Sequence, residues 1–102
     1  MRIRTFQVGT GVKYWRCNGR KHRENGPAVL WDDGYEEWYL NGLCHRDNGP
    51  AVKAPNGTCR WYREGQIHRQ DGPAILWHNG LEEYYLRGIK QPVGVSVHAS
   101  NH

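Results

Sequence analysis

A histidine followed by an arginine occurs three times in this chain, and these side chains are the best equipped for chemistry. A neutral imidazole can ligate a transition metal or act as a general base, and a guanidinium can bind a carboxylate or a phosphate. What they can do depends on whether the pairs converge on one point or stand apart. The pairs are His22-Arg23, His45-Arg46 and His68-Arg69.

The pairs recur every 23 residues, and the same interval governs most of the chain. A Gly-Pro-Ala triplet follows each pair, glycines mark two further positions, and an aromatic residue marks another. A period of roughly 20 to 50 residues is typical of stacked supersecondary units that bury apolar surface against their neighbours. The recurring residues are Gly26-Pro27-Ala28, Gly49-Pro50-Ala51 and Gly72-Pro73-Ala74; Gly11, Gly34, Gly57 and Gly80; Gly19, Gly42, Gly65 and Gly88; and Trp15, Trp38, Trp61 and Tyr84.

Within each unit, short runs separated by turn residues predict a β-hairpin. No segment has a helical period, and the glycine spacing leaves little room for one. We therefore expect an all-β fold, an elongated antiparallel sheet of stacked hairpin repeats with about 8–9 strands. The predicted strands are residues 3–8, 12–16, 27–31, 35–40, 51–54, 58–63, 74–77 and 81–86.

The chain is expected to form one domain, residues 1–102. Residues 1–10 would supply an N-terminal cap strand, residues 11–90 the repeats, and residues 91–102 a C-terminal cap and tail. Beyond His68 the repeat loses its signature, because Gln91-Pro92 occupies the next His-Arg position. The alternating Val93, Val95 and Val97 predict a short final strand over the edge of the last hairpin.

Alternation along the strands assigns side chains to faces. Two series on the outgoing strands are predicted to share one buried face, and the tyrosines of the returning strands to oppose the tryptophans. With aromatic residues on both faces, one face is incompletely covered, which predicts a groove or a binding surface. The buried series are Phe6, Val29, Val52 and Ile75, and Val8, Trp31, Ala54 and Trp77; the tyrosines are Tyr39, Tyr62 and Tyr85.

The 23-residue period, the paired strands, the aromatic residue before glycine and the Gly-x-x-His spacing together resemble MORN repeats. The resemblance spans roughly residues 11–90 and implies hairpins laid side by side in a twisted sheet. Here the motif continues as His-Arg-x-x-Gly-Pro-Ala, which looks like repeats in bacteriophage and giant-virus proteins. MORN proteins are generally scaffolds, so the resemblance implies binding rather than catalysis.

The spacing of stacked hairpins decides against a metal centre. Equivalent side chains would lie about 10 Å apart, whereas each zinc ligand must approach to about 2.1 Å. We expect no metal and no cofactor; each histidine should anchor its loop, and each arginine should pair with Glu24, Asp47 or Asp71 or stack on a tryptophan. The residues expected to maintain the repeat are His22, His45, His68, Trp15, Trp38, Trp61, Gly26, Gly49 and Gly72.

Composition and charge narrow the function classes. The 102 residues are 37% hydrophobic with a net charge of +4, and no run is apolar enough for a membrane span or a signal peptide. We therefore expect a cytoplasmic protein, in the host cell if the chain is viral. Seven of the first 24 residues are basic and one is acidic, so the N-terminal end could meet phosphates or an acidic protein. Three cysteines out of phase argue against a disulfide framework.

No nucleophile, base and orienting group recur together, and the Glu36-Glu37 and Glu82-Glu83 doublets alternate between faces, so we expect no enzyme. The preferred function is a protein-binding module, such as a phage accessory protein that inhibits a host defence complex. The alternatives are a nucleic-acid or nucleotide binder and a structural part of a virion; a homodimer also fits the repeat architecture. The candidate binding residues are Arg2, Arg4, Arg16, Arg20, Lys21, Arg23, Tyr39, Arg46, Tyr62, Arg69 and Tyr85.

Overall fold

The computed structural model describes residues 4–92, and the whole of this part of the chain is built from β-strands and turns. Helix is absent from these residues, which confirms the all-β prediction. They accordingly contain no helix that could cross a membrane. The strands are β1 Arg4–Gly9, β2 Val12–Cys17, β3 Arg20–Lys21, β4 Val29–Trp31, β5 Glu36–Glu37, β6 Tyr39–Leu40, β7 Leu43–Cys44, β8 Val52–Lys53, β9 Cys59–Arg60, β10 Tyr62–Arg63, β11 Gln66–Ile67, β12 Ile75–Leu76, β13 Glu82–Leu86 and β14 Ile89–Gln91.

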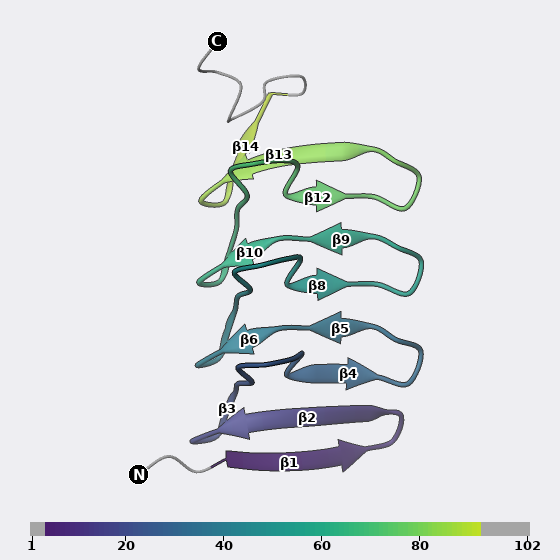
Figure 1. The fold of residues 1–102 in the computed structure, drawn as a ribbon, viewed down its shortest axis with the longest axis vertical. Helices are drawn as coiled ribbons and strands as arrows, with labels where there is room; N and C mark the ends of the chain where they lie inside the picture. Colours follow the sequence, from purple (N-terminus) through teal and green to yellow (C-terminus); the bar gives the residue numbers. More distant parts are fainter. Residues whose placement is uncertain (1–3, 93–102) are drawn as a thin grey trace.

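The units stack into one thin antiparallel sheet, as expected from the repeat. Its strands follow the order β1-β2-β4-β5-β8-β9-β12-β13-β14, so each neighbour is also close in sequence. Figure 1 shows the units stacked along the long axis, with β1 at one end of the stack and β14 at the other. The molecule measures 47 × 32 × 18 Å, and its shortest dimension leaves room for one sheet and the loops that cover it.

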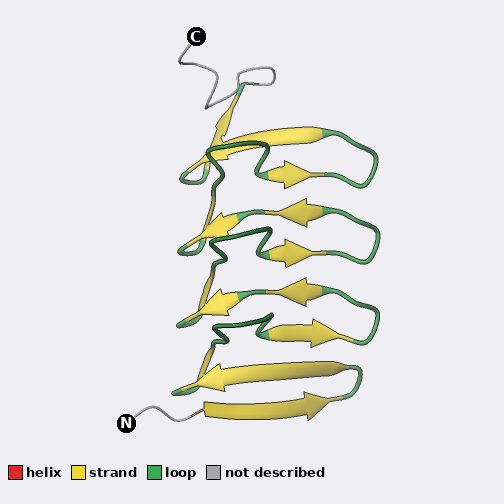
Figure 2. Cartoon of the chain, in the orientation of Figure 1, coloured by secondary structure: helices red, strands yellow, loops and turns green. Residues whose placement is uncertain are grey.

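The second and third returning strands are shorter than predicted, because the chain leaves the main sheet at the tryptophan of each, whereas β2 is one residue longer than predicted and β13 one residue shorter. β5 ends before Trp38 and β6 begins after it, and β6 pairs with β7 in a small separate hairpin. The same break occurs at Trp61, between β9 and β10. Figure 2 shows these short hairpins beside the main sheet, one in each unit.

The short hairpins are an element that the sequence interpretation missed. Asn18-Gly19 and Asn41-Gly42 were expected only to end a strand, yet in each pair both residues have positive φ and the chain returns at once as β3 or β7. Two consecutive positive φ values characterise the type I′ turn that Asn-Gly favours. These dipeptides are therefore hairpin turns.

The first hairpin differs from the others by one residue in its turn. Gly9 pairs with Val12 across two residues, whereas Trp31 N donates to Tyr35 O across three. A slip of one residue turns every side chain of a strand to the opposite face. The side chains of β1 are therefore inverted relative to those of β4.

This inversion corrects the predicted placement of Phe6. Phe6 pairs with Trp15 instead of sharing the face of Val29, and Gln7 takes that place opposite Tyr14. Phe6 is 54% exposed, because β1 has no strand beyond it to support a cover.

The buried residues confirm part of the predicted face. Val29, Val52 and Ile75 are buried, but Val8 and Trp31 are 67% and 42% exposed, so the prediction was wrong for these two. Val8 shares the inverted register of Phe6, and Trp31 lies where the hairpin turns into solvent. The core is thus a narrow line of small and medium side chains.

The predicted final strand at residues 93–97 and the tail at 99–102 lie outside the described residues. The sheet described here ends at β14, which pairs with β13 through Tyr85 opposite Lys90 and Leu86 opposite Ile89. The cysteines Cys17, Cys44 and Cys59 are free thiols, in agreement with the expected absence of a disulfide framework.

The short hairpin turns generate a stability prediction. The third unit has Glu64 at the turn position that Asn18 and Asn41 occupy in the first two units. Glu64 has φ 50°, although glutamate has no preference for this left-handed region. Glu64→Asn should raise the free energy of unfolding by up to about 1 kcal/mol, which is a few degrees in Tm for a domain of this size. Gln66→Asn, in the following strand, should give no gain. Thermal unfolding of both variants checks this, and an unchanged Tm for Glu64→Asn would contradict it.

Candidate protein interface

Each loop arginine lies flat on the tryptophan of its own unit. Its Nη1 also donates to the carbonyl oxygen of the following proline, which fixes the guanidinium in place. A guanidinium at this distance from an indole face gains both electrostatic attraction and contact area. The Cζ-to-ring distances are 3.9 Å for Arg23 over Trp15, 3.8 Å for Arg46 over Trp38 and 4.0 Å for Arg69 over Trp61.

The glycine of each Gly-Pro-Ala triplet makes room for this stack. A Cβ on Gly26, Gly49 or Gly72 would lie 2.8, 2.9 and 2.8 Å from the Cζ of the loop arginine. Carbon atoms cannot approach so closely without one of them moving. These glycines have no positive φ, so the requirement at these positions is for space and not for backbone freedom.

Alanine completes the surface beneath the stack. Trp38 N donates to Ala51 O at 2.7 Å, and Ala28 and Ala74 make the same bond with the tryptophans of their neighbouring strands. All three alanines are 0% exposed. A larger side chain here would push the tryptophans apart, so the triplet as a whole is matched to the Trp-Arg stack.

Each histidine ties its loop to the hairpin turn of the next unit. Nδ1 accepts a hydrogen bond from the backbone N–H of the first turn residue of that hairpin, which shows that Nδ1 is unprotonated. Nε2 then carries the proton, and that of His45 lies 2.8 Å from Asp47 Oδ1. The Nδ1 bonds measure 2.9 Å for Asn41 N to His22, 2.9 Å for Glu64 N to His45 and 2.8 Å for Arg87 N to His68.

The surroundings of the third histidine favour its neutral form. Burial lowers the pKa of His68 from its ordinary value, and the positive charges of Arg63 and Arg87 lower it further. All three causes disfavour the imidazolium, which has no lone pair on Nδ1 to offer. The contact between the third loop and the Arg87 turn therefore depends on a neutral ring.

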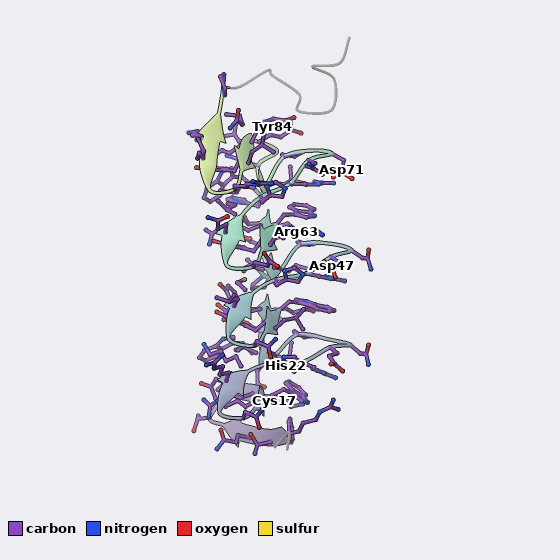
Figure 3. All side chains as sticks on the ribbon, turned by 90° about the vertical axis from the view of Figure 1, so that its left-hand side faces the viewer. Cys17, His22, Asp47, Arg63, Asp71 and Tyr84 are labelled. Carbon is purple, nitrogen blue, oxygen red and sulfur yellow. The ribbon has the colours of Figure 1, made fainter. Side chains whose placement is uncertain are left out.

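The loops, residues 22–27, 45–50 and 68–73, all extend from the same face of the sheet, which we call the loop face. Figure 3 shows the second and third loops side by side, with Asp47 and Asp71 at their labelled positions. Since two strands separate successive loops, equivalent atoms lie about 10 Å apart. The loops thus form a row of parallel ridges.

Three open hollows lie along these ridges, and we call them the slots. The first lies between β1 and the first loop, and the second and third lie between successive loops, with volumes of about 360, 190 and 540 Å³. Each contains a tryptophan and a loop arginine. The first is lined by Arg4, Phe6, Trp15, Arg23 and Glu24, the second by Arg23, Trp38, Arg46, Asp47 and Asn48, and the third by Arg46, Asn48, Trp61, Arg69 and Asp71, among others.

The rims of the slots carry the least constant positions of the motif. The two positions after each arginine are Glu24-Asn25, Asp47-Asn48 and Gln70-Asp71, and all six residues are exposed. The first position differs in every unit, whereas the second is asparagine in two units and aspartate in the third. The sequence interpretation named the arginines but missed Asn25, Asn48 and Gln70, and the change at the first position was the signal that could have pointed to this rim.

Of the predicted tyrosines, Tyr62 joins Arg46 and Arg69 in the lining of the third slot, whereas Tyr39 does not join the arginines. Tyr39 turns to the opposite face, where its hydroxyl donates to Glu37 and Lys21 lies 4.9 Å from its ring. Burial, with the charge of Glu37, raises the pKa of Tyr39 to about 12 and that of Cys44 to about 12. These groups are neutral at physiological pH and offer neither a base nor a thiolate.

The remaining predicted residues lie around the first unit and on the far face. Arg4 is 3.6 Å from Glu24, Arg16 donates to Gln7, and the side chain of Arg20 lies beside Gly42. Tyr85 donates to Glu83, which also accepts from Trp77, and Tyr62 pairs with Ile67. Arg2 lies outside the described residues. Over residues 4–92, no group of three His, Cys, Asp or Glu residues lies close enough together to hold a metal ion.

Comparison with protein-family models, with curated proteins and with solved structures finds no match to this chain. The likeness to MORN repeats and to viral His-Arg-x-x-Gly-Pro-Ala repeats therefore rests on the motif alone. The functional argument must come from the loop face itself.

The match between glycine and arginine is testable by a double-mutant cycle. Gly49→Ala should lower the free energy of unfolding by about 1–3 kcal/mol, because the new Cβ displaces the guanidinium from Trp38. In an Arg46→Ala background the same change should cost much less, since the clashing group is gone. Chemical denaturation of the four proteins measures the coupling. Equal costs in both backgrounds would show that the clash is not the cause.

The neutral His68 generates a pH prediction. Because its pKa is lower in the folded than in the unfolded chain, the unfolded state binds more protons near and below pH 6.5, and stability falls as the pH drops through this window. His68→Asn should be less stable at neutral pH but lose less on acidification between about pH 6.5 and 5, above the carboxylate range. Urea unfolding at several pH values measures both. A parallel loss in the two proteins would exclude His68 as the source.

Proposed function

We propose that this chain is a non-enzymatic protein-binding repeat module whose partner docks across the slots of the loop face. The observation that supports this most directly is that the constant and the variable residues of each loop lie in different places. Histidine, arginine, glycine and alanine are identical in the three loops and hold the fold, whereas the exposed rim changes at Glu24, Asp47 and Gln70 in every unit and at Asp71 in the third. A rigid frame with variable rim residues is suited to recognising one surface specifically.

The chemistry of the slots favours a protein partner over a nucleic acid. Tryptophan and arginine are enriched where protein interfaces concentrate their binding energy. The arginines are already held by indole rings and proline carbonyls, and the rims carry the exposed carboxylates of Glu24, Asp47 and Asp71. Carboxylates at the entrance would repel phosphates.

The resemblance to viral repeats supports a more specific form of this proposal. In it, the chain is a small phage accessory protein that acts in the host cytoplasm by binding a host protein complex, such as one that serves in defence. A stiff module without an active site suits such a role, because occlusion of a surface requires only shape and affinity.

The test fills the slots with a large side chain and leaves the constant loop residues unchanged. Asn48 lines both the second and the third slot, so Asn48→Trp should obstruct both, while Asp32→Trp places the same ring on a turn at the other end of the hairpins. Immobilised wild-type and Asp32→Trp proteins should retain the same protein from host lysate after nuclease treatment, and Asn48→Trp should lose it at unchanged Tm. Loss of all retained protein on nuclease treatment, or undiminished retention by Asn48→Trp, would contradict the proposal.

A further inference from the structure

The N-terminal edge of the sheet is open along its whole length. All six residues of β1 are exposed, whereas β2 behind it begins and ends on buried residues, Val12 and Cys17. Among residues 4–92, β1 is paired only with β2, and it is the longest strand that forms an edge of this part of the sheet. An edge strand of this kind presents unpaired backbone groups to another strand.

The register of the first hairpin identifies these groups. Gly9 and Val12 pair directly across the two-residue turn, so they exchange hydrogen bonds, and the alternate residues of β1 then point their N–H and C=O away from β2. Trp15 agrees with this alternation, because its N–H is directed to Ala28 O on the side away from β1. The outward groups belong to Arg4, Phe6 and Val8.

The side chains of these residues add an apolar strip. Phe6 and Val8 lie on one face and are 54% and 67% exposed, and Phe6 already contacts the Trp15 ring at a centroid distance of 4.9 Å. In an antiparallel ladder, the residue bonded to Phe6 would present its side chain on the same face. An added strand could therefore cover both apolar side chains.

The opposite face of the edge carries a cation. The guanidinium of Arg16 reaches over β1 to the side-chain oxygen of Gln7 on that face. A second copy of this chain would bring another Arg16 against this one, which disfavours pairing of β1 with itself. Acidic side chains on an added strand would instead meet this cation.

We propose that β1 is a docking site for a strand of a partner protein, which adds to the sheet edge with apolar residues over Phe6 and Val8 and acidic residues beside Arg16. This surface is distinct from the second and third slots, so the two proposals can fail separately. Strand addition gives affinity through the backbone and specificity through alternate side chains.

The probe is an eight-residue peptide of alternating valine and glutamate, titrated calorimetrically into the full chain. Because the outward groups belong to the residues of the apolar face, the valine amides must bond β1 and the glutamate amides must face away. N-methylation of the valine amides should weaken binding roughly tenfold or more, and N-methylation of the glutamate amides should leave it intact. A valine-lysine peptide should bind more weakly than the parent.

Two protein variants locate the site. Val8→Pro removes one outward N–H and no β1-β2 bond, so it should weaken binding without lowering Tm, whereas Val8→Thr keeps the N–H and should bind. Asn48→Trp should bind the peptide as the wild type does, even if the substitution obstructs the second and third slots. Equal effects of the two N-methylation patterns, equal binding of the lysine peptide, or a dimer in sedimentation that Val8→Pro dissociates would each overturn the proposal.

Discussion

The guanidinium that lies on an indole is the interaction on which this fold depends. A sheet this thin has only a narrow core, and among the residues that the structure describes no large side chain is fully buried. Stability must therefore come from contacts that repeat along the surface. The Trp-Arg stack supplies one such contact per unit, and the glycine, proline and alanine after the arginine are each shaped by it.

The repeat made much of this architecture predictable. Residues that recur at one interval must occupy equivalent places in every unit, so the sheet, the hairpins and the separation of the histidines followed from the sequence. The function of Gly49 did not, because its reason is the proximity of Arg46 in space, and no local pattern encodes a missing Cβ contact. A glycine in a turn motif suggests backbone freedom first.

The register of β1 shows a second limit of prediction from the sequence. Phe6 has the same sequence phase as Val29, and the phase assigned it to the wrong face because the first turn is one residue shorter. Side-chain alternation follows backbone pairing, and the pairing is set by the turn. Among the candidate site residues, the arginines were predictable from their recurrence. The rim residues required knowing that the loops extend from one face, which brings Asn48 between two neighbouring slots.

The histidine links give the stack a mechanical character. Each loop is held to the next unit by an imidazole and by backbone bonds such as Gly65 N to Cys44 O, and every such link joins nearest neighbours. Under tension applied to its two ends, the sheet would not yield as one body. It would unfold from one end, and each unit released would supply about 80 Å of extended chain, the contour length of 23 residues. A partner that bridged two neighbouring units would stabilise the link between them and slow this stepwise unfolding.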